Sequence, residues 1–183
     1  MKRADRHAPR SRAAGFALID LLFVCFMIGI LSAIALPPLM TAKEAASAAS
    51  AIGSMRAIGS GQLTYALSCG DGFYAPNLVT LGTAPPRSRE AFVSADLGSA
   101  NIVIKSNYRI QMSGAPFAPA PVTCNGLGGG MAAEGFKAGA DPLAPEVKRF
   151  FGTNSGGLVY ENTSSLYATM PEVGAPPAGT LIH

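Results

Sequence analysis

Residues Phe16 to Leu36 read FALIDLLFVCFMIGILSAIAL, an apolar run that contains one acidic side chain, Asp20. As an α-helix this run is about 31 Å long, which is enough to cross the hydrocarbon core of a membrane. A charged side chain inside such a segment is costly and usually has a functional reason. The run therefore predicts a transmembrane helix, with Asp20 as its candidate functional residue.

The segment before the run, Met1–Gly15, reads MKRADRHAPRSRAAG and carries five basic side chains against one acid. Basic flanks of a membrane span stay in the cytoplasm. We therefore expect the N-terminus to be cytoplasmic and the chain after Leu36 to lie on the opposite side of the membrane.

Three interpretations of this N-terminal region compete. A plain signal anchor leaves Asp20 unexplained. A secretory signal cleaved after Ala35, within Ala33-Ile34-Ala35, places the same carboxylate inside its apolar region. Cleavage between Gly15 and Phe16, with the helix retained, exposes an α-amino group four residues before Asp20. This third interpretation is favoured because it gives the carboxylate a partner one helical turn away.

The string GFALIDLLFVCFMIGILSAIALPPL resembles the start of type IV pilins and type II secretion pseudopilins. Those precursors have a short basic leader ending in Gly, then Phe, then an apolar helix with Glu at its fifth position. Gly15 and Phe16 match the cleavage junction, and Asp20, Gly29 and Pro37 match conserved helix positions of that family. The departure is Asp20, which is one methylene shorter than the usual Glu.

The resemblance implies two processing steps, cleavage after Gly15 by a prepilin peptidase and N-methylation of Phe16. It implies a structural subunit of a type IV pilus-type filament, with a pseudopilin of a type II secretion system as the alternative. Partners would be further copies of the chain, other pilins, the peptidase and an inner-membrane assembly platform. The chain would sit in the inner membrane before assembly and in an extracellular or periplasmic filament afterwards. A soluble secreted binding protein released at Ala35 is a less favoured alternative.

Asp20 also has a physical role in such a filament. Where parallel helices are staggered, each carboxylate can meet its own α-amino group or that of a neighbouring subunit. An unpaired charge buried among apolar helices costs several kcal/mol, so pairing favours one axial register. The competing interpretation is that Asp20 only reaches toward the membrane surface.

Helical composition continues beyond the apolar run. Pro37 and Pro38 lack N–H groups and crowd the preceding turn, so a bend between Gly29 and Pro38 is expected. Leu39–Leu67 is rich in Ala and contains no Pro. Its expected buried stripe has helical spacing and consists of Ala45, Ala48, Ala49, Ile52, Met55, Gly59, Leu63 and Ala66.

The composition changes at Cys69, after which Gly and Pro are frequent. Alternating patterns predict strands at 108–112 and 136–140, and 147–151 and 157–161 flank a hairpin turn. We expect 73–82 to be a loop, 87–97 to hold a short helix or a few turns, and 115–131 to be a Pro/Gly-rich loop.

These patterns predict an α+β fold like that of type IV pilins. A long bent N-terminal helix, transmembrane at its outer end and amphipathic in its second half, would pack on an antiparallel sheet of three or four strands. The expected divisions are a leader (1–15), an assembly helix (16–38), an amphipathic half-helix (39–68), a globular α+β head (69–163) and a loose C-terminal tail (164–183).

Cys69 and Cys124 both lie in the part expected to be exported, where disulfides persist. A bridge between them would stabilise the head by roughly 4 kcal/mol on the chain-entropy model. Two free thiols or a metal site are the alternatives, although no His lies near them in the sequence. Cys25, within the apolar run, is expected to be an inert packing residue.

The sequence offers little for an enzyme or a cofactor. The two histidines are His7 in the leader and His183 at the end, and no hydrolase, zinc-protease or phosphate-loop motif occurs. Without the leader, nine basic side chains face ten acidic ones, which is not the charge balance of a nucleic-acid-binding protein. We expect no catalytic residue, no metal, no cofactor and no nucleic-acid partner.

Overall fold

One helix, α1 (Leu18–Ser68), begins in the apolar run and continues for 51 residues. The computed structural model describes residues 18–182, which have an α+β fold. α1 continues through Pro37 and Pro38 rather than ending at them. The other elements are α2 (Leu78–Leu81), α3 (Ala95–Gly98), β1 (Ile102–Lys105), β2 (Tyr108–Ser113), β3 (Lys137–Pro142), β4 (Phe150–Asn154), β5 (Val159–Asn162) and β6 (Thr180–Leu181).

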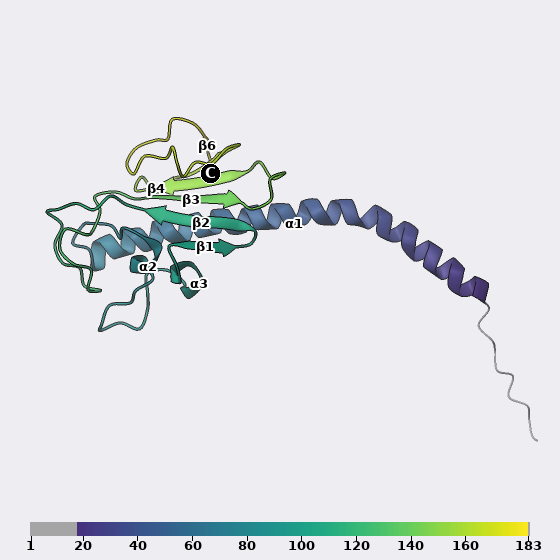
Figure 1. Cartoon of the computed structure of the whole chain (residues 1–183), viewed down its shortest axis with the longest axis horizontal. Coiled ribbons are helices and arrows are strands. Elements are labelled where there is room, and N and C mark those ends of the chain that lie inside the picture. Colours follow the sequence, from purple (N-terminus) through teal and green to yellow (C-terminus); the bar gives the residue numbers. More distant parts are fainter. Residues whose placement is uncertain (1–17, 183) are drawn as a thin grey trace, which may run out of the picture. The chain divides into compact units, whose positions relative to one another are not determined.

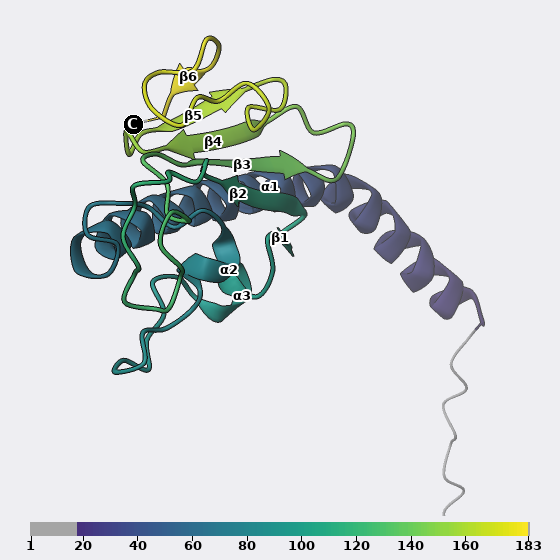
Figure 2. The same ribbon diagram turned by 60° about the vertical axis from the view of Figure 1, so that its left-hand side comes forward.

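The chain divides into two units, Met1–Ala42 and Lys43–His183. In the first unit, the described residues 18–42 all belong to α1. The second unit contains the rest of α1 and every other element. In this unit the second half of α1 packs on one sheet, and Figures 1 and 2 show it lying along that sheet.

The sheet is a six-stranded antiparallel meander with the strand order β1-β2-β3-β4-β5-β6. The sequence predicted three or four strands and missed the two at the edges, β1 and β6. β1 and β2 are joined by Ser106 and Asn107, which both have positive φ, as a two-residue type I′ hairpin requires. The hairpin expected between 147–151 and 157–161 is confirmed as β4 and β5, although β4 begins three residues later than expected and includes Thr153 and Asn154, which were assigned to the turn.

The core lies between the second half of α1 and the inner face of the sheet. β2 shows the alternation expected of a strand with one buried face, because Tyr108, Ile110 and Met112 point inward. Phe151 from β4 and Val159 from β5 extend the same cluster. α2 and α3 add Leu78, Leu81 and Leu97, all of which are buried.

The buried stripe of α1 differs in part from the expected one. The residues that face the core recur at spacings of three and four: Ala48, Ala51, Met55, Ile58, Gln62 and Tyr65. Ala48, Met55 and Ala66 are buried as predicted, but Ala45, Ala49 and Leu63 are exposed. The predicted stripe included Leu63 and excluded Gln62, because Gln62 is polar. In the structure Gln62 is buried, since its side chain forms hydrogen bonds with the backbone of Ala75.

One of the two assignments made between α1 and β1, the loop over 73–82, needs correction. The segment 73–82, expected to be a loop, contains the one-turn helix α2, which Asn77 caps by accepting the N–H of Thr80. The short helix or few turns expected over 87–97 are present as turns and bends followed by α3, which ends one residue beyond that range.

The segment after Ser164 is not loose. We call residues 163–179 the strap, because they cross the outer face of the sheet, where Leu166 and Met170 are buried. The strap lies on two glycines that pair across β3 and β4, Gly139 and Gly152. A Cβ atom on Gly139 would lie 2.7 Å from the Cβ of Tyr167. Without side chains at these two positions, the outer face has room for the strap.

Candidate functional site

The most unusual surface of the described chain is the N-terminal part of α1. Its large apolar side chains are exposed on all sides of the helix, from 44% for Ile30 to 80% for Leu18. They are Leu18, Ile19, Leu21, Leu22, Phe23, Val24, Phe26, Met27, Ile28, Ile30, Leu31, Ile34, Leu36, Leu39 and Met40. A helix that is apolar all round requires a covering of lipid or of other helices.

This helix is long and apolar enough to cross a membrane. Its most apolar window has a mean hydropathy of 2.6, and none of that window is buried inside the protein. Charged side chains are nearly absent from it, since Asp20 is the one between Leu18 and Ala42. Membrane anchoring near the N-terminus is therefore consistent with the length and composition of α1.

Asp20 lies in the first turn of α1, with its side chain exposed. A carboxylate in the first turn interacts favourably with the positive end of the helix dipole. Within residues 18–182 no Lys or Arg forms an ion pair with it. The two predicted processing residues, Gly15 and Phe16, lie outside the described residues.

The remaining predicted assembly positions lie on the same helix but not at one place. Gly29 is nine residues beyond Asp20, and Pro37 is eight residues further, so these positions are about 13 Å and 12 Å apart along the axis. A Cβ atom on Gly29 would meet nothing within 4 Å. These residues are therefore spaced along a surface and do not converge on a pocket.

The predicted bridge between Cys69 and Cys124 is present and joins residues 55 positions apart. It links the segment that follows α1 to the Pro/Gly-rich loop. The two backbones also meet there, because the N–H of Cys124 donates to the carbonyl of Cys69 at 3.0 Å. Cys25 is a free thiol, exposed on the N-terminal part of α1.

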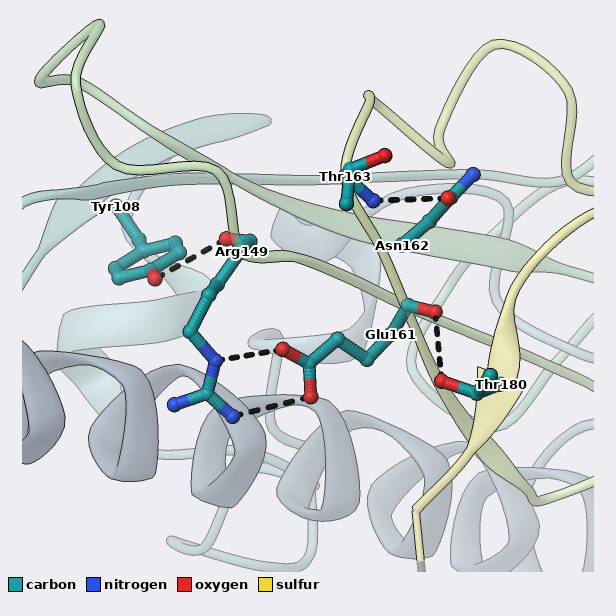
Figure 3. A network of polar contacts seen from close by, with 6 residues as sticks. All are labelled: Tyr108, Arg149, Glu161, Asn162, Thr163 and Thr180. Carbon is teal, nitrogen blue, oxygen red and sulfur yellow. Dashed lines mark hydrogen bonds and ion pairs between the residues drawn. The ribbon is translucent and has the colours of Figure 1, made fainter.

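Sequence reasoning missed the polar network that joins β2, β4, β5 and β6 (Figure 3). The guanidinium of Arg149 donates two hydrogen bonds to the carboxylate of Glu161, at 2.6 and 3.0 Å. The hydroxyl of Tyr108 donates to the carbonyl of Arg149, and that of Thr180 donates to the carbonyl of Glu161. These residues are scattered in the sequence, so only the strand register reveals the network.

Two carboxylates in the second unit have shifted pKa values, in opposite directions. Asp96 accepts a 2.6 Å contact from Lys105, which lowers its pKa to about 2. Burial raises the pKa of Asp141, and the hydrogen bond from Ser165 and the charge of Arg109 oppose that rise. One oxygen of Asp141 is buried without a hydrogen-bond partner among the described residues.

Two surface hollows of similar volume lie among the described residues of the second unit. One, of about 560 Å³, is lined by the 85–92 loop, Ser68 and Cys124. The other, of about 530 Å³, lies between α1 and the β4–β5 turn and includes Arg56 and Leu63. Among residues 18–182 no cluster of His, Cys, Asp and Glu has the arrangement of a metal site.

No protein-family model, no curated protein and no solved structure matches this chain. The assignment of function therefore depends on the physical features described above.

Proposed function

We propose that this chain is the structural subunit of a type IV pilus-type filament, assembled through its apolar helix. The observation that carries the proposal is the composition of α1. An uncovered apolar surface with one carboxylate near its start continues, in the same helix, into the core of a disulfide-bonded domain. Such a helix fits both a membrane before assembly and a bundle of identical helices afterwards.

Cleavage after Gly15 completes the proposed assembly site. The new α-amino group of Phe16 would lie four residues before Asp20, and N-methylation leaves an amine that can carry a positive charge. Within a bundle of staggered helices, the carboxylate of one subunit neutralises the amine of the next. Leaving either charge unpaired in that apolar surrounding costs several kcal/mol, so the pair selects the axial register.

The second unit has the properties of a filament's outer layer. It combines a small hydrophobic core with a disulfide, and this bridge stabilises a domain of modest size against unfolding outside the cytoplasm. The proposed partners are further copies of the chain, other pilins, a prepilin peptidase and an inner-membrane assembly platform. The chain would act mechanically rather than as an enzyme.

The N-terminal sequence and intact mass of the mature protein test this proposal. We expect N-methylated Phe16 as the first residue, with the mass lowered by two hydrogens for the disulfide. A mature chain that begins at Leu36 in the soluble fraction would overturn the proposal, because that protein has lost the apolar helix. Unprocessed Met1 at the N-terminus in membranes would equally contradict it.

Fractionation of the cells distinguishes a pilus subunit from a pseudopilin of a type II secretion system. A pilus subunit is expected in material sheared from the cell surface, and a pseudopilin is expected to stay with the cell envelope. The Asp20→Ala variant is the matched control. We expect it only in the membrane fraction, where it shows how unassembled subunit is recovered.

A further inference from the structure

The two cysteines of the disulfide differ in their exposure. Cys69 is 8% exposed and belongs to the core cluster, whereas Cys124 is exposed. The hollow of about 560 Å³ is lined by Cys124 and not by Cys69. A reagent that enters from solvent therefore reaches the bridge from the Cys124 side.

The walls of this hollow suit the approach of a thiolate. Pro85, Pro86 and Phe92 supply an apolar surface, and Arg87 supplies a positive charge that attracts an anion. Glu90 lies in the same lining and opposes that attraction. Removing the charge of Arg87 and removing that of Glu90 should therefore change the rate of attack by a thiolate in opposite directions.

The structure around Cys124 has connections that do not depend on the disulfide. The amide of Asn125 donates to the carbonyls of Thr80 and Thr83, at 2.9 and 3.2 Å, and accepts from the hydroxyl of Thr123 at 2.7 Å. The backbone hydrogen bond from Cys124 to Cys69 adds a third connection between this loop and the rest of the domain, since the bond between Thr123 and Asn125 lies within the loop. These bonds keep the loop in place when the sulfurs separate, so exchange does not require the domain to unfold.

We propose that the Cys69–Cys124 bridge is a thiol–disulfide exchange site at which a dithiol protein attacks Cys124. The attacking thiolate forms a new S–S bond with the sulfur of Cys124. The Cys69–Cys124 bond breaks, and its electron pair leaves on the sulfur of Cys69, which takes up a proton. The partner's second thiol then attacks its own bonded sulfur and releases Cys124 as a thiol. The partner is thereby oxidised by two electrons and the bridge reduced by two.

The reverse sequence closes the bridge. The thiolate of Cys124 attacks the disulfide of an oxidised partner, and Cys69 then displaces the partner from the mixed disulfide. Access determines the order of the steps in both directions, since Cys124 is the exposed cysteine and lines the hollow from which another protein approaches. This inference does not depend on filament assembly.

A trapping experiment on the full-length protein in detergent tests which sulfur is attacked. The probe is a thioredoxin-type protein that keeps its attacking cysteine and has serine in place of the resolving one, so that the mixed disulfide accumulates. We expect peptide mapping to find the adduct on Cys124. An adduct on Cys69, or formation of the adduct only in denaturant, would overturn the proposal.

Reduction by dithiothreitol supplies the kinetic test. We expect a rate proportional to the thiolate concentration under native conditions, with no loss of circular dichroism before the bridge opens. A rate that is independent of thiol concentration and equal to the unfolding rate would show that exchange requires unfolding, which contradicts the proposal.

Charge variants test the role of the hollow. Arg87→Ala should slow the reaction by about threefold and Glu90→Gln should accelerate it by a similar factor, as expected for exposed charges. Arg56 lines the other hollow, so Arg56→Ala is the matched control and should leave the rate of disulfide reduction unchanged. Equal rates in all three variants would contradict attack through this hollow.

Discussion

Gln62 is fully buried in α1, and both ends of its side-chain amide are used. Its Nε2 donates to the carbonyl of Ala75 at 2.8 Å, and its Oε1 accepts the N–H of Ala75 at 2.9 Å. The side-chain amide therefore pairs with the backbone of Ala75 as a neighbouring strand would, and it connects the loop after α1 to the helix. A buried backbone N–H or C=O without a partner costs about 1–3 kcal/mol.

Replacement of Gln62 by Ala should therefore lower the free energy of unfolding by about 2–4 kcal/mol. Both backbone groups of Ala75 lose their partner, and a cavity adds to the loss. Chemical unfolding of the full chain in detergent, followed by circular dichroism, measures the change. Ser60→Ala is the control, because Ser60 is exposed and bonds only within its own helix. A loss no greater than that of the control would refute this role.

Asp141 predicts a pH dependence of stability. Because burial raises its pKa, the folded chain holds the proton more tightly than the unfolded chain does. The ionised carboxylate therefore costs stability above the folded pKa, and this cost disappears as the pH falls below the ordinary value of 3.8. Asp141→Asn keeps an oxygen to accept the hydroxyl of Ser165 and removes the charge.

We expect Asp141→Asn to raise the free energy of unfolding at pH 7 by less than about 1 kcal/mol, because solvent screens the half-buried carboxylate, with no gain near pH 3. Denaturant midpoints for the variant and the parent at both pH values measure this difference. Asp71→Asn is the matched control, since that carboxylate is exposed in a turn with positive φ, which Asn also tolerates. A gain that is equal at pH 3 and pH 7 would contradict the electrostatic explanation.

At the scale of elements, the strap depends on the glycine pair beneath it. A Cβ on Gly139 would lie 2.7 Å from the Cβ of Tyr167 and 3.2 Å from its Cα, so the strap backbone has to move. On Gly152 the nearest atom is the terminal methyl of Met170, which is flexible and can turn aside. Alanine should therefore be worse tolerated at Gly139 than at Gly152.

Gly139→Ala is expected to cost about 1–3 kcal/mol of stability and to expose the strap. Chymotrypsin should then cleave near Leu166 and Tyr167 in the folded protein, where the parent chain resists. Gly53→Ala provides the control, because its Cβ meets nothing within 4 Å and alanine favours the helix. Persistence of the parent's protease resistance in Gly139→Ala would show that the strap adapts without cost.

The elements that could be predicted from the sequence are those with strong local patterns. β2 alternates apolar and polar residues over its whole length, and the β4–β5 turn has adjacent glycines. β1 has four residues and a Ser-Asn turn without glycine, and β6 has two residues, so neither carries a clear signal. The strap was missed for a different reason, since its burial depends on glycines that only the sheet register brings together.

At the scale of the whole molecule, composition predicts the surface of α1 better than it predicts the core. The apolar run alone indicated a helix able to span a membrane, since no tertiary contact was needed to recognise it. The rotation of the α1 stripe was not predictable, because alanine and glycine give weak contrast and Gln62 is buried only through its partner Ala75. The disulfide was predictable from the expected compartment, and it is present.

The proposed assembly role of Asp20 has a direct test in cells that make the filament. Asp20→Ala should leave cleavage after Gly15 intact and reduce filaments in the sheared surface fraction by tenfold or more, on the order of the several kcal/mol lost with an unpaired buried amine. Asp20→Glu, which keeps the charge and lengthens its reach, should assemble at least as well as the parent. Cys25→Ser, five residues along the same apolar surface, is the control and should assemble normally. If Asp20→Ala yields normal amounts of filament from correctly processed subunits, the carboxylate does not set the register, and apolar packing alone aligns the helices.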